Sequence, residues 1–205
     1  MDIKLKICGI RSVEEAKLAR DLPIDYLGLN FIPTSTRYIS LETAQAIVDE
    51  LTSSKLVGLF AGHPLDEVNE YARRLNLDYV QLHGDEPADY AVAVDAPVMR
   101  AIAVDPEETA VELLDFINRF PADYFVLDRQ LQGRGEAVNL DIANKIIEGT
   151  TKKIFFAGGL TPHNLNEVLA KIHPYGIDIA GGVRDSGNRL DTAKVQRCSD
   201  LLRGH

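Results

Sequence analysis

The chain alternates short apolar runs with longer stretches in which apolar residues recur at helical spacing. The first run, residues 3–7, alternates apolar and polar positions as a half-buried strand does, and Cys8 and Gly9 follow where that strand should end. Ser12 is placed to cap the next helix, with Glu15 at the capping-box position. We therefore expect Cys8 at the carboxyl end of a strand, directly before a turn into a helix.

Seven more units of strand, loop and helix follow at regular intervals. The expected strands are residues 26–31, 55–60, 79–83, 98–102, 124–128, 153–157 and 176–180. The expected helices begin at 12 and then cover residues 40–51, 64–75, 88–94, 106–119, 139–148, 164–172 and 191–202. A polar, glycine-bearing loop is expected at residues 129–138.

This strict alternation predicts an α/β fold with a single parallel sheet and right-handed crossovers. Eight strands favour a closed sheet, the (β/α)8 or TIM barrel, because open doubly wound sheets usually have five or six strands. No Gly-x-Gly-x-x-Gly follows the first strand, and no linker rich in Pro, Gly or Ser interrupts the repeats. We expect residues 1–205 to form a single (β/α)8 barrel domain.

Composition and charge narrow the function classes. The net charge is −9 and no basic cluster is present, which argues against nucleic acid and membrane surfaces as partners. No apolar run is long enough to cross a bilayer, and the first residues lack the pattern of a signal peptide, so we expect a cytoplasmic location. The only cysteines, Cys8 and Cys198, have no metal-type spacing, so neither a metal site nor a disulfide is expected.

Two residues at strand ends are candidates for acid–base chemistry. Cys8 could be an ordinary small buried residue or a reactive thiol, and a thiol with the usual pKa would need activation by its pocket. Asp128 ends a strand of apolar and aromatic residues. It could cap the following loop, or act as an acid whose pKa is raised by apolar walls.

Glycine pairs follow the last two strands. Gly158-Gly159 and Gly181-Gly182 could be plain turns, but they stand where many barrels bind phosphate through backbone N–H groups. Asp178 lies within the last strand and could face the barrel interior in a purely architectural role.

Three further polar residues are expected at the same end of the barrel. Arg37 lies in a long loop after the second strand, where its planar guanidinium would suit a carboxylate or a phosphate. Gln81 and His83 end the fourth strand, and they could either face the pocket or be ordinary hydrogen-bonding residues.

Several stretches along the whole chain resemble one family. They are Lys6-Ile7-Cys8-Gly9-Ile10-Arg11, the loop from Gly28 to Thr36-Arg37-Tyr38, Val80-Gln81-Leu82-His83-Gly84-Asp85-Glu86, Val126-Leu127-Asp128 with Gly133-Arg134-Gly135, Ala157-Gly158-Gly159-Leu160-Thr161-Pro162-His163-Asn164, and Asp178 with Gly182-Val183. Together they resemble the phosphoribosylanthranilate isomerases of tryptophan biosynthesis.

The resemblance implies a (β/α)8 barrel without a cofactor or a metal. The family's reaction is the Amadori rearrangement of N-(5-phosphoribosyl)anthranilate to 1-(2-carboxyphenylamino)-1-deoxyribulose 5-phosphate. Cys8 would be the general base, Asp128 the general acid and Arg37 the residue that holds the anthranilate carboxylate. The glycine pairs would hold the phosphate, and Gln81, His83 and Asp178 are expected to bind the rest of this small phosphoribosyl substrate.

This chemistry needs one group protonated and the other deprotonated at the start. We therefore expect the pKa of Asp128 to be raised and that of Cys8 to be lowered. The sequence also departs from the family's usual pattern, mostly near the phosphate and the acid. The departures are Ala61-Gly62, Arg129, Arg134, Ala180, Gly181, Arg184 and Leu190.

Two other functions stay open at this point. A barrel isomerase acting on another phosphoribosyl substrate, of the histidine-pathway type, typically uses aspartates on strands 1 and 5, where this chain has Cys8 and Met99-Arg100. A non-catalytic barrel that binds a phosphosugar would need neither Cys8 nor Asp128. No extra apolar helix face is apparent, so a monomer is expected rather than a homodimer.

Overall fold

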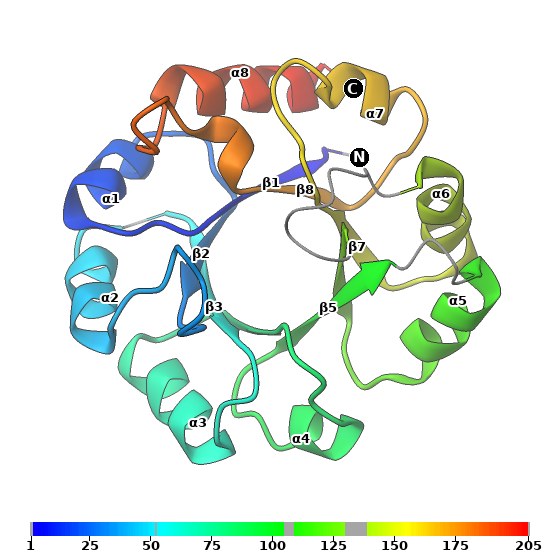
Figure 1. Cartoon of the computed structure of the whole chain (residues 1–205), viewed down its shortest axis with the longest axis horizontal. Helices are drawn as coiled ribbons and strands as arrows, with labels where there is room; N and C mark the ends of the chain where they lie inside the picture. Colours follow the sequence, from blue (N-terminus) through cyan, green and yellow to red (C-terminus); the bar gives the residue numbers. More distant parts are fainter. Residues whose placement is uncertain (1, 52, 105–108, 130–138, 205) are drawn as a thin grey trace.

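Eight parallel strands close into a barrel in the order β1 to β8, which confirms the predicted fold (Figure 1). The computed structural model describes residues 2–51, 53–104, 109–129 and 139–204. The strands are β1 (Lys4–Cys8), β2 (Tyr26–Asn30), β3 (Lys55–Phe60), β4 (Tyr79–Leu82), β5 (Val98–Val104), β6 (Tyr124–Arg129), β7 (Lys153–Phe156) and β8 (Gly176–Ile179). β1 pairs with both β2 and β8, so the sheet has no open edge.

Helices surround the barrel, one after each strand (Figure 1). They are α1 (Val13–Arg20), α2 (Leu41–Val48), α3 (Leu65–Arg74), α4 (Ala88–Val92), α5 (Ala110–Arg119), α6 (Leu140–Gly149), α7 (Leu165–Leu169) and α8 (Thr192–Arg203). Polar side chains start several of them: Ser12 accepts a hydrogen bond from the backbone N–H of Glu15, and Ser40 accepts one from that of Thr43. These caps satisfy amide groups that have no partner within the helix.

The structure differs from the sequence prediction at several boundaries. α5 begins at Ala110, where Thr109 and Glu112 form a capping box, whereas the predicted start at Pro106 lies outside the described residues. Most strand ends differ from the prediction by one or two residues, and β6 continues through Arg129. Gly181–Val183 forms a short 3₁₀ helix, η1, instead of a plain turn. The predicted loop 129–138, including Arg134, lies almost wholly outside the described residues.

Alternation along each strand separates two apolar cores. One set of residues packs outward under the helices, and the other fills the interior of the barrel. The interior set includes Cys8, Val57, Met99, Val126 and Phe155, all less than a tenth exposed. The barrel is therefore filled by side chains and leaves polar groups at its two mouths.

The amino ends of the strands are closed by a tyrosine cluster, which consists of Tyr26, Tyr79, Tyr124 and Tyr175. The hydroxyls of Tyr26 and Tyr175 are 3.1 Å apart, and that of Tyr79 donates to that of Tyr124 at 3.2 Å. Lys153 donates to the Tyr124 oxygen at 3.0 Å. Candidate chemistry is thus left to the opposite mouth. No helix in the described ranges is long and apolar enough to span a membrane.

Candidate active site

Cys8 is the last residue of β1, as predicted, and its side chain lies in the barrel interior beneath the carboxyl-terminal mouth. It is 8% exposed. The neighbouring strand leaves room for the sulfur with Gly28, where an added Cβ would come 3.0 Å from Cys8 Sγ. Neither cysteine forms a disulfide, and Cys198 is buried on α8, far away in sequence. Cys8 is therefore placed to act on a ligand at this mouth.

A buried ion pair lies one layer below Cys8. Lys6 Nζ is 2.6 Å from Asp178 Oδ2, and the two residues face each other in the register of β1 and β8. Lys6 is fully buried and Asp178 is 8% exposed. Burial by itself would lower the pKa of Lys6, but the charge and hydrogen bond of Asp178 together with the charges of Cys8 and Asp128 raise it. Lys6 therefore keeps its positive charge inside the barrel.

The expectation that the pKa of the Cys8 thiol is lowered is wrong. Burial raises that pKa to about 11, and the carboxylates of Asp178 and Asp128 act in the same direction. Lys6 and Arg37 act in the opposite direction without overcoming burial. The thiol is thus protonated at neutral pH until something changes its surroundings.

Asp128 and His83 occupy the same mouth. Asp128 is half-buried in β6, and its charge acts on Lys6, Cys8 and His83. His83 follows β4 and is exposed at the mouth, yet the protein around it lowers its pKa by desolvation against the opposing influence of Asp128. A lowered pKa keeps His83 neutral at pH 7.

Gln81 supports the His83 ring from within the barrel. The Gln81 side chain is almost fully buried, and its amide Nε2 donates to His83 Nδ1 at 3.2 Å. That bond places the imidazole proton on Nε2, where it can be donated to a ligand. Gln81 Oε1 and Asp178 Oδ1 are both buried without a hydrogen-bond partner among the described residues. Such oxygens favour a ligand that brings hydroxyl groups.

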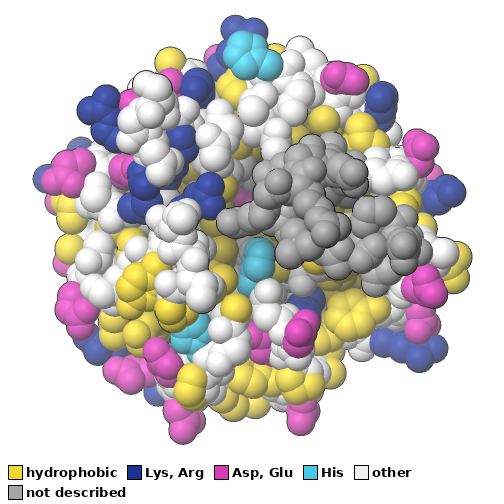
Figure 2. Space-filling view, in the orientation of Figure 1, with side chains coloured by type: hydrophobic (Ala, Val, Ile, Leu, Met, Phe, Trp, Pro, Cys, Tyr) yellow, Lys and Arg dark blue, Asp and Glu magenta, His cyan; other side chains and the backbone are white. Residues whose placement is uncertain are grey.

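Arg37 crosses the rim of this mouth. Its side chain lies so close to Gly9 that a Cβ on Gly9 would come within 2.3 Å of Arg37 Cδ. Its guanidinium reaches toward Gly181, whose Cβ position is 3.6 Å from Arg37 Nη2. In Figure 2, Lys and Arg side chains gather over the segment that follows β1. An arginine here can meet an anionic group above Cys8.

The two glycine pairs form adjoining loops after β7 and β8. Gly158 and Gly159 have φ values of +96° and +71°, which favour glycine. Gly182 lies against the other loop, since a Cβ on it would be 1.8 Å from the carbonyl oxygen of Leu160. Backbone groups thus line this part of the rim at close range.

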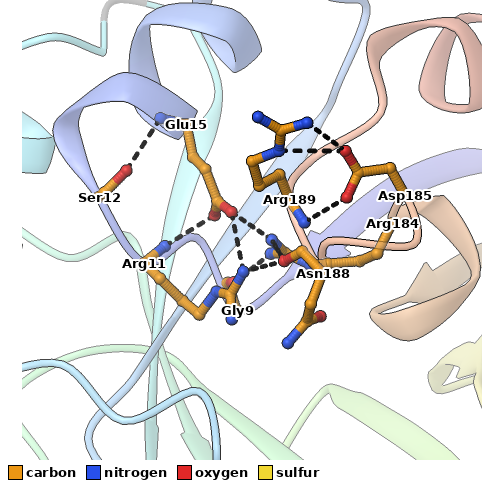
Figure 3. A network of polar contacts seen from close by, with 8 residues as sticks. All are labelled: Gly9, Arg11, Ser12, Glu15, Arg184, Asp185, Asn188 and Arg189. Atoms are coloured by element: carbon orange, nitrogen blue, oxygen red, sulfur yellow. Dashed lines mark hydrogen bonds and ion pairs between the residues drawn. The ribbon is translucent and has the colours of Figure 1, made fainter.

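A polar network joins the β8 side of the mouth to the loop after β1 (Figure 3). The Glu15 carboxylate accepts hydrogen bonds from the backbone N–H of Arg11 at 3.0 Å and from its guanidinium at 3.2 Å, and it pairs with Arg184. Arg184 also donates to the backbone oxygens of Gly9 and Asn188. Glu15 and Arg184 are both buried.

The other departures from the family pattern have simple surroundings. Leu190 is buried in the outer core and lies opposite Arg184 in a short antiparallel bridge. Ala180 packs against the interior core just before η1. Within the described residues no group of three His, Cys, Asp or Glu side chains could hold a metal ion.

Sequence analysis assigned Lys6, Glu15 and Arg184 no role in the site, although Arg184 stood out as a departure from the family pattern and Glu15 as a capping residue. For Lys6 a signal existed, because it stands two residues before Cys8 and therefore on the same face of the strand. No comparable signal identified the partners, since Lys6–Asp178 and Arg184–Glu15 join residues 172 and 169 positions apart.

Comparison with known proteins agrees with this geometry. The family model for N-(5'phosphoribosyl)anthranilate (PRA) isomerase matches residues 5–200. The chain belongs to the PRA isomerase family. The N-(5'-phosphoribosyl)anthranilate isomerase of Geobacter metallireducens is 37% identical over 199 residues, which are 95% of this chain and 96% of the relative. That of Citrifermentans bemidjiense is 38% identical, covering 95% and 94% of the two chains.

Solved PRA isomerases share the fold over nearly the whole chain. The enzyme from Thermus thermophilus superposes with a TM-score of 0.86 at 33% identity, covering 98% of this chain and 99% of its own. A PRA isomerase in complex with reduced 1-(o-carboxyphenylamino)-1-deoxyribulose 5-phosphate gives a TM-score of 0.84 at 25% identity, covering 99% and 100%. Both the family and the barrel inferred from the sequence are thus confirmed.

Proposed function

We propose that this chain isomerises N-(5-phosphoribosyl)anthranilate to 1-(2-carboxyphenylamino)-1-deoxyribulose 5-phosphate in tryptophan biosynthesis. One observation carries the proposal. A thiol at the end of β1, Cys8, and a carboxyl near the end of β6, Asp128, belong to one barrel mouth and affect each other electrostatically. An Amadori rearrangement needs one acid and one base on the same sugar, and this pair can supply them.

Asp128 is the general acid in this proposal. Its proton goes to the ring oxygen of the ribose, the bond between that oxygen and C1 breaks, and the nitrogen lone pair forms a C1–N double bond. The product of this step is an open-chain iminium ion. Asp128 then carries a negative charge next to a positively charged intermediate.

Cys8 is the general base in the second step. Its thiolate takes the proton from C2 of the sugar, and the electron pair of that C–H bond moves toward the iminium to give an enolamine. The enolamine then tautomerises to the ketone, so no oxidant or reductant is consumed. The Asp128 charge raises the pKa of Cys8, and loss of the Asp128 proton therefore strengthens the base when it is needed.

The high pKa of Cys8 means that the thiol needs an activating event before it can act as a base. A protonated Asp128 favours the Cys8 thiolate before the ring opens, the positive charge of the iminium ion favours it afterwards, and Lys6 and Arg37 act in that direction throughout. We expect Cys8 and Asp128 to titrate as a coupled pair, in which protonation of one group favours ionisation of the other.

Binding groups surround this pair on the mouth. Arg37 is positioned for the anthranilate carboxylate, to which its guanidinium can donate two parallel hydrogen bonds. The loops of Gly158-Gly159 and Gly181-Gly182 would offer backbone N–H groups to the phosphate. Asp178 Oδ1 and Gln81 Oε1 lack partners among the described residues and would accept from sugar hydroxyls, and His83 would donate from Nε2.

A histidine-pathway type of isomerase finds less support. That class needs a second carboxylate on the fifth strand, and here Met99 fills the barrel interior while Arg100 pairs with Glu86 at 2.9 Å.

The expected monomer also stays a prediction, since one solved relative from Thermotoga maritima is described as dimeric. Sedimentation equilibrium at micromolar concentration decides between one copy and two.

The proposed function is tested by giving the wild-type protein freshly made phosphoribosylanthranilate and following its fluorescence. We expect the signal to disappear with saturation kinetics. A parallel reaction with aminoimidazole carboxamide ribotide, the histidine-pathway substrate, should show no turnover. Binding of phosphoribosylanthranilate without turnover would instead support a non-catalytic barrel.

A further inference from the structure

We propose that Arg184 is a positioning residue for the base: it holds the backbone carbonyl of Gly9, the residue after Cys8, and so fixes the Gly9–Ile10 peptide at the end of β1. This inference rests on the proposed function. The hydrogen bonds described for the Arg184 side chain go to Glu15, Asn188 and Gly9 and not to Cys8, so it would act through the backbone. Figure 3 shows the arrangement, with the Arg184 side chain extending from the β8 side toward the loop after β1.

The Arg184 side chain makes contacts that a surface arginine would not. Its side chain is 3% exposed. One guanidinium nitrogen donates to the oxygen of Gly9, and the other contacts Glu15 Oε1 and donates to the Asn188 oxygen at 3.3 Å. Because burying a cation is costly unless it is paired and hydrogen-bonded, this position is strongly determined by its partners.

Gly9 is held from a second side as well. Its φ of +83° belongs to the left-handed region, and the Arg37 side chain occupies the space where a Cβ would lie. Its N–H donates to the Gly28 oxygen at 2.9 Å. The backbone of Gly9 is therefore fixed by Arg184, Arg37 and β2 together. Release of one restraint would let the end of β1 shift.

Arg184 also joins the end of β1, which carries the base, to the loop of Gly181-Gly182 after β8. Arg184 directly follows η1, and its backbone N–H donates to the Gly181 oxygen at 3.1 Å. Its own carbonyl accepts from Lys194 Nζ at 2.6 Å, which ties the segment to α8. Arg184 thus connects the Gly181-Gly182 backbone to the carbonyl of Gly9 through one side chain.

Glu15 orients Arg184 from α1. Its carboxylate also accepts from the N–H and guanidinium of Arg11, so it closes the turn between β1 and α1. A glutamate in place of Arg184 could pair with Arg11 but could not donate to the Gly9 oxygen. The contact with Gly9 therefore needs a side chain at this position that donates a hydrogen bond.

The test compares Arg184→Met with Arg189→Met, a matched control on the same loop. Arg189 is exposed and pairs only with Asp185 in the described structure. We expect Arg184→Met to lower kcat by at least about tenfold, because small displacements of a reacting group are costly. KM should stay within about threefold, since no direct substrate contact is lost. Arg189→Met should leave both values unchanged.

A charge exchange separates positioning from simple structural support. The double variant Glu15→Arg with Arg184→Glu keeps an ion pair between the loops, but its carboxylate at position 184 cannot donate to Gly9. We expect it to recover thermal stability relative to Arg184→Met without recovering kcat. Arg184→Lys keeps a donor and should retain an intermediate kcat. Full recovery of kcat in the charge exchange, or a wild-type kcat in Arg184→Met, would overturn the proposal.

A second readout is independent of turnover. In a Cys198→Ala background, the rate at which iodoacetamide alkylates Cys8 reports how the thiol is held. Arg184→Met should increase this rate, and Arg189→Met should not. Equal rates in both would contradict the proposal even if the wild type failed to isomerise the substrate, an outcome that would separately contradict the proposed function. Arg184→Lys serves both assays if Arg184→Met does not fold.

Discussion

The two mouths of the barrel differ in how completely their polar groups are paired. At the amino ends of the strands, each phenol of the tyrosine cluster hydrogen-bonds another, and lysines contact their rings. At the carboxyl ends, two buried oxygens, Asp178 Oδ1 and Gln81 Oε1, have no partner within the described ranges. A mouth whose polar groups are satisfied stabilises the fold, whereas one with polar groups left over can bind a ligand.

The lysines show the same contrast. Lys6, near the carboxyl-terminal mouth, is fully buried and is paired with one carboxylate, that of Asp178. Lys55 and Lys153, at the amino-terminal mouth, are exposed and contact tyrosine rings and hydroxyls. Burial makes the first pair sensitive to the loss of either partner, while solvent can replace the contacts of the exposed lysines.

The largest expected effect is that of replacing Cys8 at the carboxyl-terminal mouth, with Cys198 on α8, away from both mouths, as the control. Cys8→Ala should lower kcat by about 1,000-fold, because it removes the group that takes the C2 proton. Cys198→Ala, which truncates a buried thiol on α8, should lower thermal stability and leave kcat unchanged. Steady-state kinetics and thermal melts of both variants check this. Similar kcat values for the two would remove Cys8 from the mechanism.

Replacing the buried lysine should have the next largest effect. Lys6→Met leaves Asp178 as an uncompensated buried charge, which should cost about 3 kcal/mol of unfolding free energy. Lys55→Met at the amino-terminal mouth should lower the unfolding free energy by less than about 0.5 kcal/mol. Urea unfolding of the two variants gives the comparison. Equal destabilisation would show that the Lys6–Asp178 pair adds nothing beyond its packing.

The high pKa of Cys8 makes a pH-dependent prediction. Because the thiolate is the reactive form and burial raises the pKa to about 11, the alkylation rate should rise about tenfold per pH unit from pH 7 to 10 without a plateau. Iodoacetamide alkylation in the Cys198→Ala background measures it. A plateau below pH 9 would mean that the thiol is activated in the ligand-free protein, contrary to this structure.

The smallest expected effect belongs to the tyrosine cluster. Tyr79→Phe removes the hydroxyl that donates to Tyr124, so it should lower unfolding free energy by about 1 kcal/mol. The kcat of this variant should be unchanged, since the amino-terminal mouth takes no part in the proposed reaction. Urea unfolding and steady-state kinetics of this variant check both statements. A clear fall in kcat would show that the two mouths are not independent.

Sequence patterns were sufficient for the barrel and for Cys8 and Asp128 at strand ends. Periodicity reports the face and the end of each strand, and both properties are local. Closure of the sheet brings Lys6 to Asp178 and Arg184 to Glu15, and neither pairing follows from local pattern. The pKa of Cys8 depends on burial within the closed barrel, which explains why the expected direction was wrong.

The most direct test of the acid–base account is the turnover of phosphoribosylanthranilate by Asp128→Asn, followed by fluorescence beside the wild type. Asparagine keeps the shape of the side chain but cannot supply a proton to the ring oxygen. The account predicts that kcat falls by about 1,000-fold while the fold is retained. A kcat within about tenfold of the wild type would contradict the assignment of Asp128 as the general acid.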